Sequence, residues 1–341
     1  MRKFAIILLL TTTVLTTSAQ DIHFSQFNAA PLNLNPCNTG LFDGDYRFIL
    51  NHRNQWSSIT IPFNTYSGAF DMVLPTKEWK IKNLPSGIWG AGIVLNSDNA
   101  GDGSLSLIEA KVSLSYTQKI KKDSTMFLSF ALQPGITNKS INNNKLQFDN
   151  QWDGDAYNPN LPTGEAFQRN SMTYTDINMG IRWHYKLKQR SAITLGLAYD
   201  HFGKPVETFQ SSYNSVLYPK IAFHAIGQFM VSDQFDLLPT WLYEKQNTFS
   251  EAIMGVNGKY IVDAEQNTNL YMGLFVRFND AVIPMVSMDY ASFTLGISYD
   301  INTSQLKAAS NGHGGLEISL CYIIKKFRPI TPGKKICPVY L

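Results

Sequence analysis

The chain has 341 residues, of which 44% are hydrophobic and only 16% are charged, a composition that excludes an intrinsically disordered protein. A formal net charge of +3 argues against nucleic acid as a partner, and 3 cysteines are too few for a disulfide-rich scaffold. A helical membrane protein is also excluded, because no stretch reaches the roughly 20 consecutive apolar residues that a spanning helix needs.

Residues 1–19 have the features of a secretory signal peptide. Arg2 and Lys3 provide the positive start, an apolar run begins at Phe4, and Ala19 is the small residue at the expected cleavage site. We therefore predict that cleavage after Ala19 leaves a mature chain that works outside the cytoplasm.

The following segment, residues 20–44, is rich in Phe, Asn and Pro and lacks the alternation of a strand. We predict that it is a periplasmic segment preceding a β-barrel. Its apolar residues would anchor it against the periplasmic mouth of the barrel, where it would serve as a lid or as a platform that binds a partner. These residues are Phe24, Phe27, Leu32 and Leu34.

From Asp45 onward apolar and polar residues alternate with period two, which is the signature of β-strands. In one such stretch Ile108 and Val112 lie on one face, and Glu109 and Lys111 lie on the other. About fourteen segments of this kind recur, separated by clusters of Gly, Asn, Asp and Pro. Their approximate limits are 45–53, 65–74, 87–96, 104–118, 124–136, 173–187, 192–201, 220–231, 234–244, 250–260, 270–279, 281–289, 292–302 and 315–324.

This pattern predicts an all-β protein, an outer-membrane transmembrane β-barrel of about 14 antiparallel strands over residues 45–324. Closure leaves no strand edge unpaired in the hydrocarbon layer, and the apolar face of each strand would contact outer-membrane lipid. Long connections at 137–172, 202–219 and 303–314 alternate with short ones such as 188–191, which indicates that the first strand runs outward. A secreted β-sandwich with one buried face is the alternative.

Charged residues of both signs face the predicted lumen. Because uncompensated charge is costly in a poorly hydrated interior, we predict that these residues pair with one another and that the lumen is partly plugged. They are Arg47, Asp71, Glu109, Lys111, Asp176, Arg182, Glu251, Arg277, Asp300 and Glu317.

The connection at 137–172 is a candidate partner surface outside the cell. Its Trp152 and Tyr157 are aromatic residues of the kind that anchor protein interfaces, and long loops on a rigid scaffold often carry binding. A solvated loop that folds over the mouth of the barrel is the alternative. The acidic residues of the loop would also suit a calcium ion that orders the loop.

Basic residues cluster at the predicted periplasmic end, at 77–82, 119–122, 186–190 and 325–328. A positive ring of this kind would contact periplasmic machinery or phospholipid head groups, whereas the alternative is a set of ordinary solvated turns.

Residues 325–341 form a predicted periplasmic tail after the last strand. The tail carries Cys337, and Cys37 precedes the first strand, which becomes a neighbour of the last strand once the barrel closes. In an oxidising compartment a disulfide between Cys37 and Cys337 is therefore one prediction, and free thiols are the alternative.

No motif for catalysis or cofactor binding is present. The chain lacks a phosphate-binding glycine loop, a zinc-protease helix signature and a nucleophile elbow, and its 6 histidines lack metal-ligand spacing. We therefore expect no enzymatic activity, no cofactor and no bound metal.

Three stretches resemble the PorP/SprF family of outer-membrane proteins, which accompany the type IX secretion and gliding machinery of Bacteroidetes. The first runs from Gln20 to Gly40 and includes Gln-Asp-Ile-His-Phe-Ser-Gln-Phe and Ala-Pro-Leu-Asn-Leu-Asn-Pro. The second is Arg-Asn-Gln-Trp at 53–56, and the third runs from Ser298 to Leu320. Cys37 departs from the family pattern, which often has a small residue at that position.

The resemblance implies a barrel without enzymatic activity that works with secreted cargo. The implied partners are a large surface adhesin, or its C-terminal sorting domain, and periplasmic proteins of the secretion or motility apparatus. A porin-like solute channel and a passive structural component of the outer membrane are the alternatives.

Overall fold

The structure, a computed structural model, describes residues 21–56, 61–74, 87–101, 103–120, 125–164, 169–209, 215–304 and 307–325. The predicted signal peptide and most of the predicted tail lie outside these residues. The described chain forms fourteen β-strands. They are β1 (Tyr46–Gln55), β2 (Phe63–Leu74), β3 (Ile88–Ala100), β4 (Leu105–Lys119), β5 (Met126–Ser140), β6 (Ser171–Lys188), β7 (Ser191–Asp200), β8 (Lys220–Met230), β9 (Phe235–Gln246), β10 (Phe249–Asp263), β11 (Thr268–Arg277), β12 (Ala281–Tyr290), β13 (Phe293–Asn302) and β14 (His313–Ile324).

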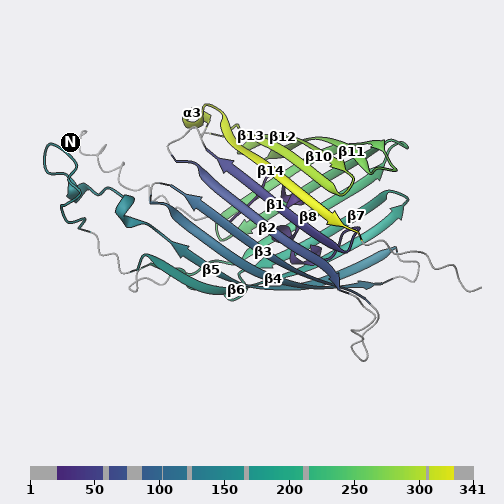
Figure 1. The fold of residues 1–341 in the computed structure, drawn as a ribbon, viewed down its shortest axis with the longest axis horizontal. Helices are drawn as coiled ribbons and strands as arrows, with labels where there is room; N and C mark the ends of the chain where they lie inside the picture. Colours follow the sequence, from purple (N-terminus) through teal and green to yellow (C-terminus); the bar gives the residue numbers. More distant parts are fainter. Residues whose placement is uncertain are drawn as a thin grey trace, which may run out of the picture.

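The strands form one closed antiparallel barrel (Figure 1). Each strand pairs with its neighbours along the chain, and β1 closes the ring by pairing with β14. The register of this closure places Arg53 opposite Glu317. The predicted fourteen-stranded all-β barrel is therefore confirmed, and the sandwich alternative is wrong because the strands form a single ring rather than two stacked sheets.

Alternate residues of each strand face the lumen and the outside. On β4, Lys111, Ser113 and Ser115 are buried in the lumen, whereas Val112 and Leu114 between them are 56% and 47% exposed. The outer wall is thus apolar along its middle, as a surface in contact with acyl chains must be.

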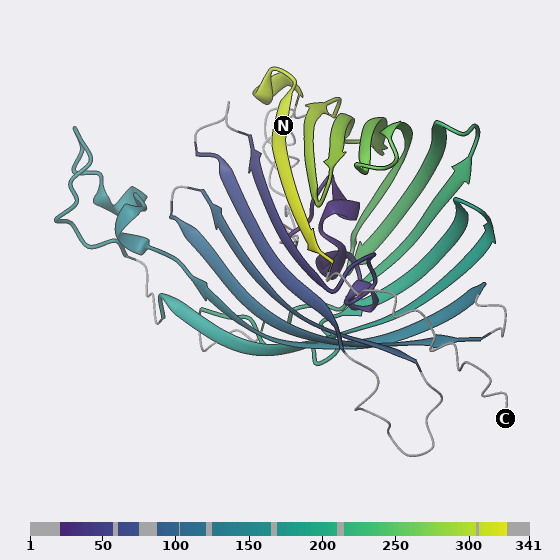
Figure 2. The same ribbon diagram turned by 45° about the vertical axis from the view of Figure 1, so that its right-hand side comes forward.

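The links between strands distinguish the two ends of the barrel. We call the end with the β5–β6, β7–β8 and β13–β14 links the loop end, and the end where the chain enters β1 and leaves β14 the turn end. Turn-end links include 189–190, where Arg190 has a φ of 54°, and 231–234. The β5–β6 loop stands out from the barrel in Figure 2.

The helical elements are short and belong to the segment before β1 and to the loops, not to the barrel wall. Before β1 they are η1 (Phe27–Ala29), α2 (Pro31–Leu34) and η2 (Pro36–Asn38), and in the loops they are η3 (Asn143–Lys145), η4 (Asp149–Gln151) and α3 (Lys307–Ser310). In the part of the chain that the structure describes, no helix is long and apolar enough to cross a membrane.

The segment before β1 lies inside the barrel, as the purple coil between the walls shows (Figure 2). We predicted that this segment would rest against the periplasmic mouth, and this location is wrong. Fourteen strands enclose more space than the wall side chains fill, so a segment carrying Phe and Leu residues enters and packs the lumen. We call residues 21–44 the plug.

Candidate functional site: the plugged lumen

The plug runs through the lumen from the loop end to the turn end. At its start, Asp21 contacts His201 and Lys220, which lie where β7 ends and β8 begins at the loop end. At its far end, the carbonyl oxygen of Asn38 accepts a hydrogen bond of 3.0 Å from Arg47, the second residue of β1. Because it is attached at both ends, the plug traverses the barrel rather than covering one opening.

The loop-end attachment is a histidine between two carboxylates. The Nε2 atom of His201 lies 2.6 Å from Asp21 of the plug, and its Nδ1 atom lies 2.5 Å from Asp176 of β6. Burial opposes a charge on His201, but the two carboxylates outweigh this effect and raise its pKa to about 10. The protonated imidazole and Lys220 in turn outweigh the burial of Asp21 and lower the pKa of that carboxyl.

Glu317 of β14 binds the backbone of the plug. Its two carboxylate oxygens accept hydrogen bonds from the backbone N–H groups of Ser25 at 2.6 Å and Gln26 at 2.9 Å. The side chain of Gln26 donates to the carbonyl oxygen of Glu317 at 3.1 Å. On the neighbouring strand, a Cβ atom at Gly296 would lie 2.5 Å from the Ser319 hydroxyl and 2.6 Å from the Gln26 side chain, so a larger residue there would displace both of these side chains.

Two arginines and an aspartate surround the same part of the plug. Arg53 and Arg277 lie 3.1 and 3.0 Å from Asp300, and the Ser25 hydroxyl donates to that carboxylate at 2.8 Å. Arg53 also donates to the carbonyl oxygen of His23 at 2.8 Å. All three charged side chains are at most 3% exposed, so each charge depends on the others for compensation.

At the turn end Arg47 and Asp71 form a bidentate ion pair, in which the Nε and Nη2 atoms of Arg47 donate to the two carboxylate oxygens of Asp71 at 2.9 and 2.8 Å. Asp71 accepts a further hydrogen bond of 2.7 Å from the backbone N–H of Gly40 in the plug. Gly40 has a φ of 71°, and a Cβ atom there would lie 2.6 Å from the Cα atom of Gly90. The sequence therefore needs glycine at this point of the plug for both conformation and space.

The predicted pairing of lumen charges is confirmed for most of the set. Besides the pairs above, Glu109 and Lys111 pair at 2.8 Å, and Arg277 lies 3.5 Å from Glu251. Arg182 is different, because among the described residues no carboxylate lies within ion-pair distance of its buried guanidinium.

Apolar packing holds the middle of the plug. Phe24, Phe27, Leu32 and Leu34 are 4%, 4%, 1% and 6% exposed. Phe27 packs edge-on against Phe275 of β11 at 6.4 Å between ring centroids. The four side chains predicted to anchor the segment at the mouth are therefore enclosed by the lumen wall, and in this state they do not form a surface that a partner can reach.

Cys37 lies at the contact between η2 and β4–β6. It is 0% exposed, its thiol is free, and burial raises the pKa of that thiol to about 12. Its sulfur lies 3.5 Å from the carbonyl oxygen of Ser129. The predicted disulfide partner, Cys337, lies outside the described residues.

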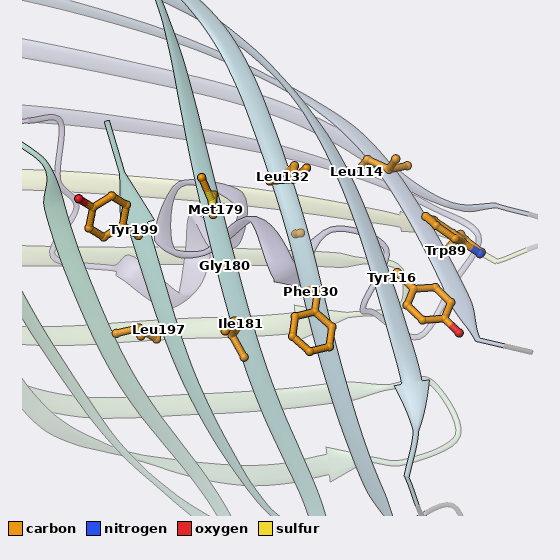
Figure 3. A pocket seen from close by; sticks show the side chains of 11 residues that line it. Trp89, Leu114, Tyr116, Phe130, Leu132, Met179, Gly180, Ile181, Leu197 and Tyr199 are labelled. Atoms are coloured by element: carbon orange, nitrogen blue, oxygen red, sulfur yellow. The ribbon is translucent and has the colours of Figure 1, made fainter. Parts of the chain in front are cut away.

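The wall behind η2 carries an apolar hollow on its outer face, which we call the outer depression (Figure 3). It has a volume of about 610 Å³ and is lined from β3–β7 by residues that include Trp89, Tyr116, Phe130 and Ile181. On the inner face, a Cβ atom at Gly180 would lie 2.1 Å from the Asn35 side chain, so the plug touches backbone at this point.

The candidate residues of the β5–β6 loop lie away from the plug. Trp152 is 59% exposed, and it forms an isolated antiparallel bridge with Tyr157. The Tyr157 hydroxyl donates to Gln151 at 3.4 Å. Among the described residues, no group of three His, Cys, Asp or Glu side chains could hold a metal ion.

Some residues that hold the plug were not predicted from the sequence. Arg53 is in phase with Arg47 on β1, so the period-two rule places it on the lumen face. Asp21, Ser25 and His201 lie outside strands, where no periodicity reveals which way a side chain points. Residues 20–27 and the last strand both belong to stretches that carry the family resemblance, but the resemblance did not indicate that they touch.

Comparison with known proteins adds a family and a fold. A family model described as "Type IX secretion system membrane protein PorP/SprF" matches residues 16–322. The solved toluene transporter TbuX of Ralstonia pickettii aligns with a TM-score of 0.53 at 10% identity, over 86% of this chain and 92% of that one. The toluene transporter TodX of P. putida aligns with a TM-score of 0.52 at 9% identity, over 86% and 93%. These likenesses show the barrel fold alone. No curated protein matches the chain.

Proposed function

The chain belongs to the PorP/SprF family of type IX secretion system membrane proteins, and from this premise we propose that it anchors or helps to export a secreted surface protein at the outer membrane. The partner would be a large adhesin or its C-terminal sorting domain. The loop end would face the outside of the cell, because long loops lie on that side of bacterial barrels.

The observation that carries this proposal is the plug. At the loop end its Asp21 forms an ion pair with His201 of the wall, and at the turn end its backbone hydrogen-bonds to the Arg47–Asp71 ion pair of the wall. Apolar side chains pack between the two ends. A lumen filled in this way does not suit free diffusion of solutes. A barrel with a filled lumen instead offers a rigid, membrane-embedded support whose loops and turns bind other proteins.

Both ends of the barrel carry surfaces suited to partners. At the loop end the exposed Trp152 is the kind of side chain that anchors interfaces. At the turn end Lys119, Lys186, Lys188 and Lys325 are exposed, and they would attract acidic periplasmic components of the secretion or motility machinery.

Purification from native outer membranes tests the proposal. We expect a secreted surface protein and periplasmic secretion components to co-purify with the wild-type barrel, and we expect planar bilayers to show no steady conductance. A stable conductance without any co-purifying secreted protein would contradict the proposal. An unrelated barrel of the same membrane, purified with the same tag, is the control for adventitious capture.

A channel for small apolar solutes is the second candidate. The observation in its favour is the outer depression, which places an apolar hollow on the wall that the plug touches. Loss of uptake of an apolar solute on deletion of the gene, with surface proteins displayed normally, would favour this candidate over the first.

A further inference from the structure

A second cavity opens at the loop end, above the start of the plug. It has a volume of about 810 Å³, and we call it the vestibule. Trp56, Phe249 and Phe278 provide aromatic surface, and Phe278 is 49% exposed, so the vestibule is accessible from outside the barrel. Glu251 and Arg277 provide charges of both signs on the same lining.

The vestibule is the place where the three stretches that carry the family resemblance meet. His23 comes from the first stretch, Trp56 from the second, and Ser304 from the third, and all of them line the cavity. These positions are far apart in the sequence, and closure of β1 against β14 brings them together.

Two buried polar atoms of the vestibule have no hydrogen-bond partner. They are the Nε atom of Arg277 and the Oε1 atom of Glu251, which lie 3.5 Å apart as an ion pair without a hydrogen bond between them. The two residues are only 3% and 9% exposed. Buried donors and acceptors are normally satisfied, so a ligand that offers both an acceptor and a donor would satisfy both atoms by parting this loosely joined pair.

The barrel already binds a peptide with this combination of groups. Next to the vestibule, the Glu317 carboxylate accepts backbone N–H groups of the plug, and Arg53 donates to the carbonyl oxygen of His23. A carboxylate and a guanidinium therefore hold the two sides of one stretch of main chain. Glu251 and Arg277 repeat the pair of groups in the vestibule, where among the described residues the Oε1 atom of Glu251 and the Nε atom of Arg277 have no hydrogen-bond partner.

We propose that the vestibule binds an extended peptide segment of a secreted polypeptide, as a continuation of the path of the plug. Arg277 would donate to a backbone carbonyl oxygen of this segment, and Glu251 would accept a backbone N–H group. The aromatic side chains would receive one apolar side chain of the segment. The origin of the peptide in a secreted protein rests on the proposed function, whereas the peptide chemistry rests on the vestibule itself.

Site-specific photocrosslinking in the native host tests this inference. Phe278 is replaced by the photocrosslinking residue p-benzoylphenylalanine, and the crosslinked product is digested and mapped by mass spectrometry. The control places the same residue at Phe48, an aromatic side chain of β1 on the outer wall that is 44% exposed. We expect position 278 to crosslink one short contiguous peptide of a secreted protein, and position 48 to yield no such peptide.

A filling variant separates binding in the vestibule from contacts elsewhere. Ser304→Trp occupies the cavity without removing a charge from the ion-pair network, and it should reduce crosslinking from position 278 at least tenfold. Ser292→Trp, on an exposed residue in the turn between β12 and β13, should leave the crosslink unchanged. Heat-modifiable migration in gels confirms that each variant still forms a barrel.

The outcomes distinguish this inference from the proposed function. If a secreted protein co-purifies but crosslinks only to a photoreactive residue at position 152, the vestibule inference is wrong and the proposed function stands. A crosslink from position 278 to carbohydrate or lipid alone also overturns the inference. If no secreted protein co-purifies and position 278 gives no peptide, both fail.

Discussion

Replacement of Glu317 by Gln tests whether polar contacts hold the plug. The variant removes the carboxylate that accepts the backbone N–H groups of Ser25 and Gln26, and it leaves Arg53 with Asp300 as its remaining ion-pair partner. An amide oxygen can keep one of the two backbone hydrogen bonds, but it carries no charge.

The size of the effect follows from these contacts. A hydrogen bond to a charged group contributes about 1.5–3 kcal/mol, and loss of one partner of a buried ion pair costs more when no other partner remains. Because Arg53 keeps Asp300, we expect the plug to be weakened by about 2–4 kcal/mol. Since 1.4 kcal/mol corresponds to a tenfold change, transient release of the plug should rise about 30- to 700-fold.

Hydrogen exchange followed by mass spectrometry measures this release in the detergent-solubilised barrel. Peptides covering residues 21–30 should exchange faster by that factor in Glu317→Gln, and brief conductance events should appear in planar bilayers. Glu265→Gln, in an exposed turn between β10 and β11, is the matched control. Exchange of the plug within twofold of the wild type, in a correctly folded variant, would refute the reasoning and leave apolar packing as the main attachment.

Three further predictions concern the attachment and surfaces of the plugged barrel. The pKa of His201 is raised to about 10, above its ordinary value of 6.5, so its contribution to stability is full below pH 6.5 and is lost as the pH rises through about 10. Exchange of residues 21–24 should therefore increase in that alkaline window in the wild type, beyond the intrinsic rise that unfolded peptides show, but not in His201→Gln. Phe27→Ala removes a ring that packs against Phe275, and it should lower the free energy of unfolding by about 3–5 kcal/mol in urea titrations. An unchanged midpoint of the urea transition would mean that the lumen collapses into the cavity that the ring leaves. Trp152→Ala, at an exposed loop position, should change the free energy of unfolding by less than about 0.5 kcal/mol. In pull-down titrations it should weaken binding of the secreted partner by about 2 kcal/mol. Unchanged binding would show that this loop is not part of the interface.

The wall of the barrel was predictable because its rules are local. A strand that faces lipid on one side and a polar lumen on the other must alternate every second residue, so Val112 and Lys111 reveal their faces without knowledge of any distant residue. The predicted strand limits differ from the observed ones by a few residues at most, and the predicted pairing of charges such as Arg47 with Asp71 follows from their shared face.

The path of the plug could not be read in the same way. Its helical elements span three or four residues each, which is too short to show a period. The apolar side chains of the plug indicated that it must be anchored against something apolar, and they would be satisfied either at the mouth of a barrel or inside it.

The sequence by itself determined the wall, because alternation is a property of neighbouring residues in one strand. Only the tertiary structure decided where residues 21–44 lie, because the contacts that hold them join positions such as Ser25 and Glu317, which are 292 residues apart. Those contacts exist only after the first and last strands pair and set the width of the lumen. The physical reason is that a space to be filled is created by closure of the whole sheet, and no local stretch of sequence contains that information.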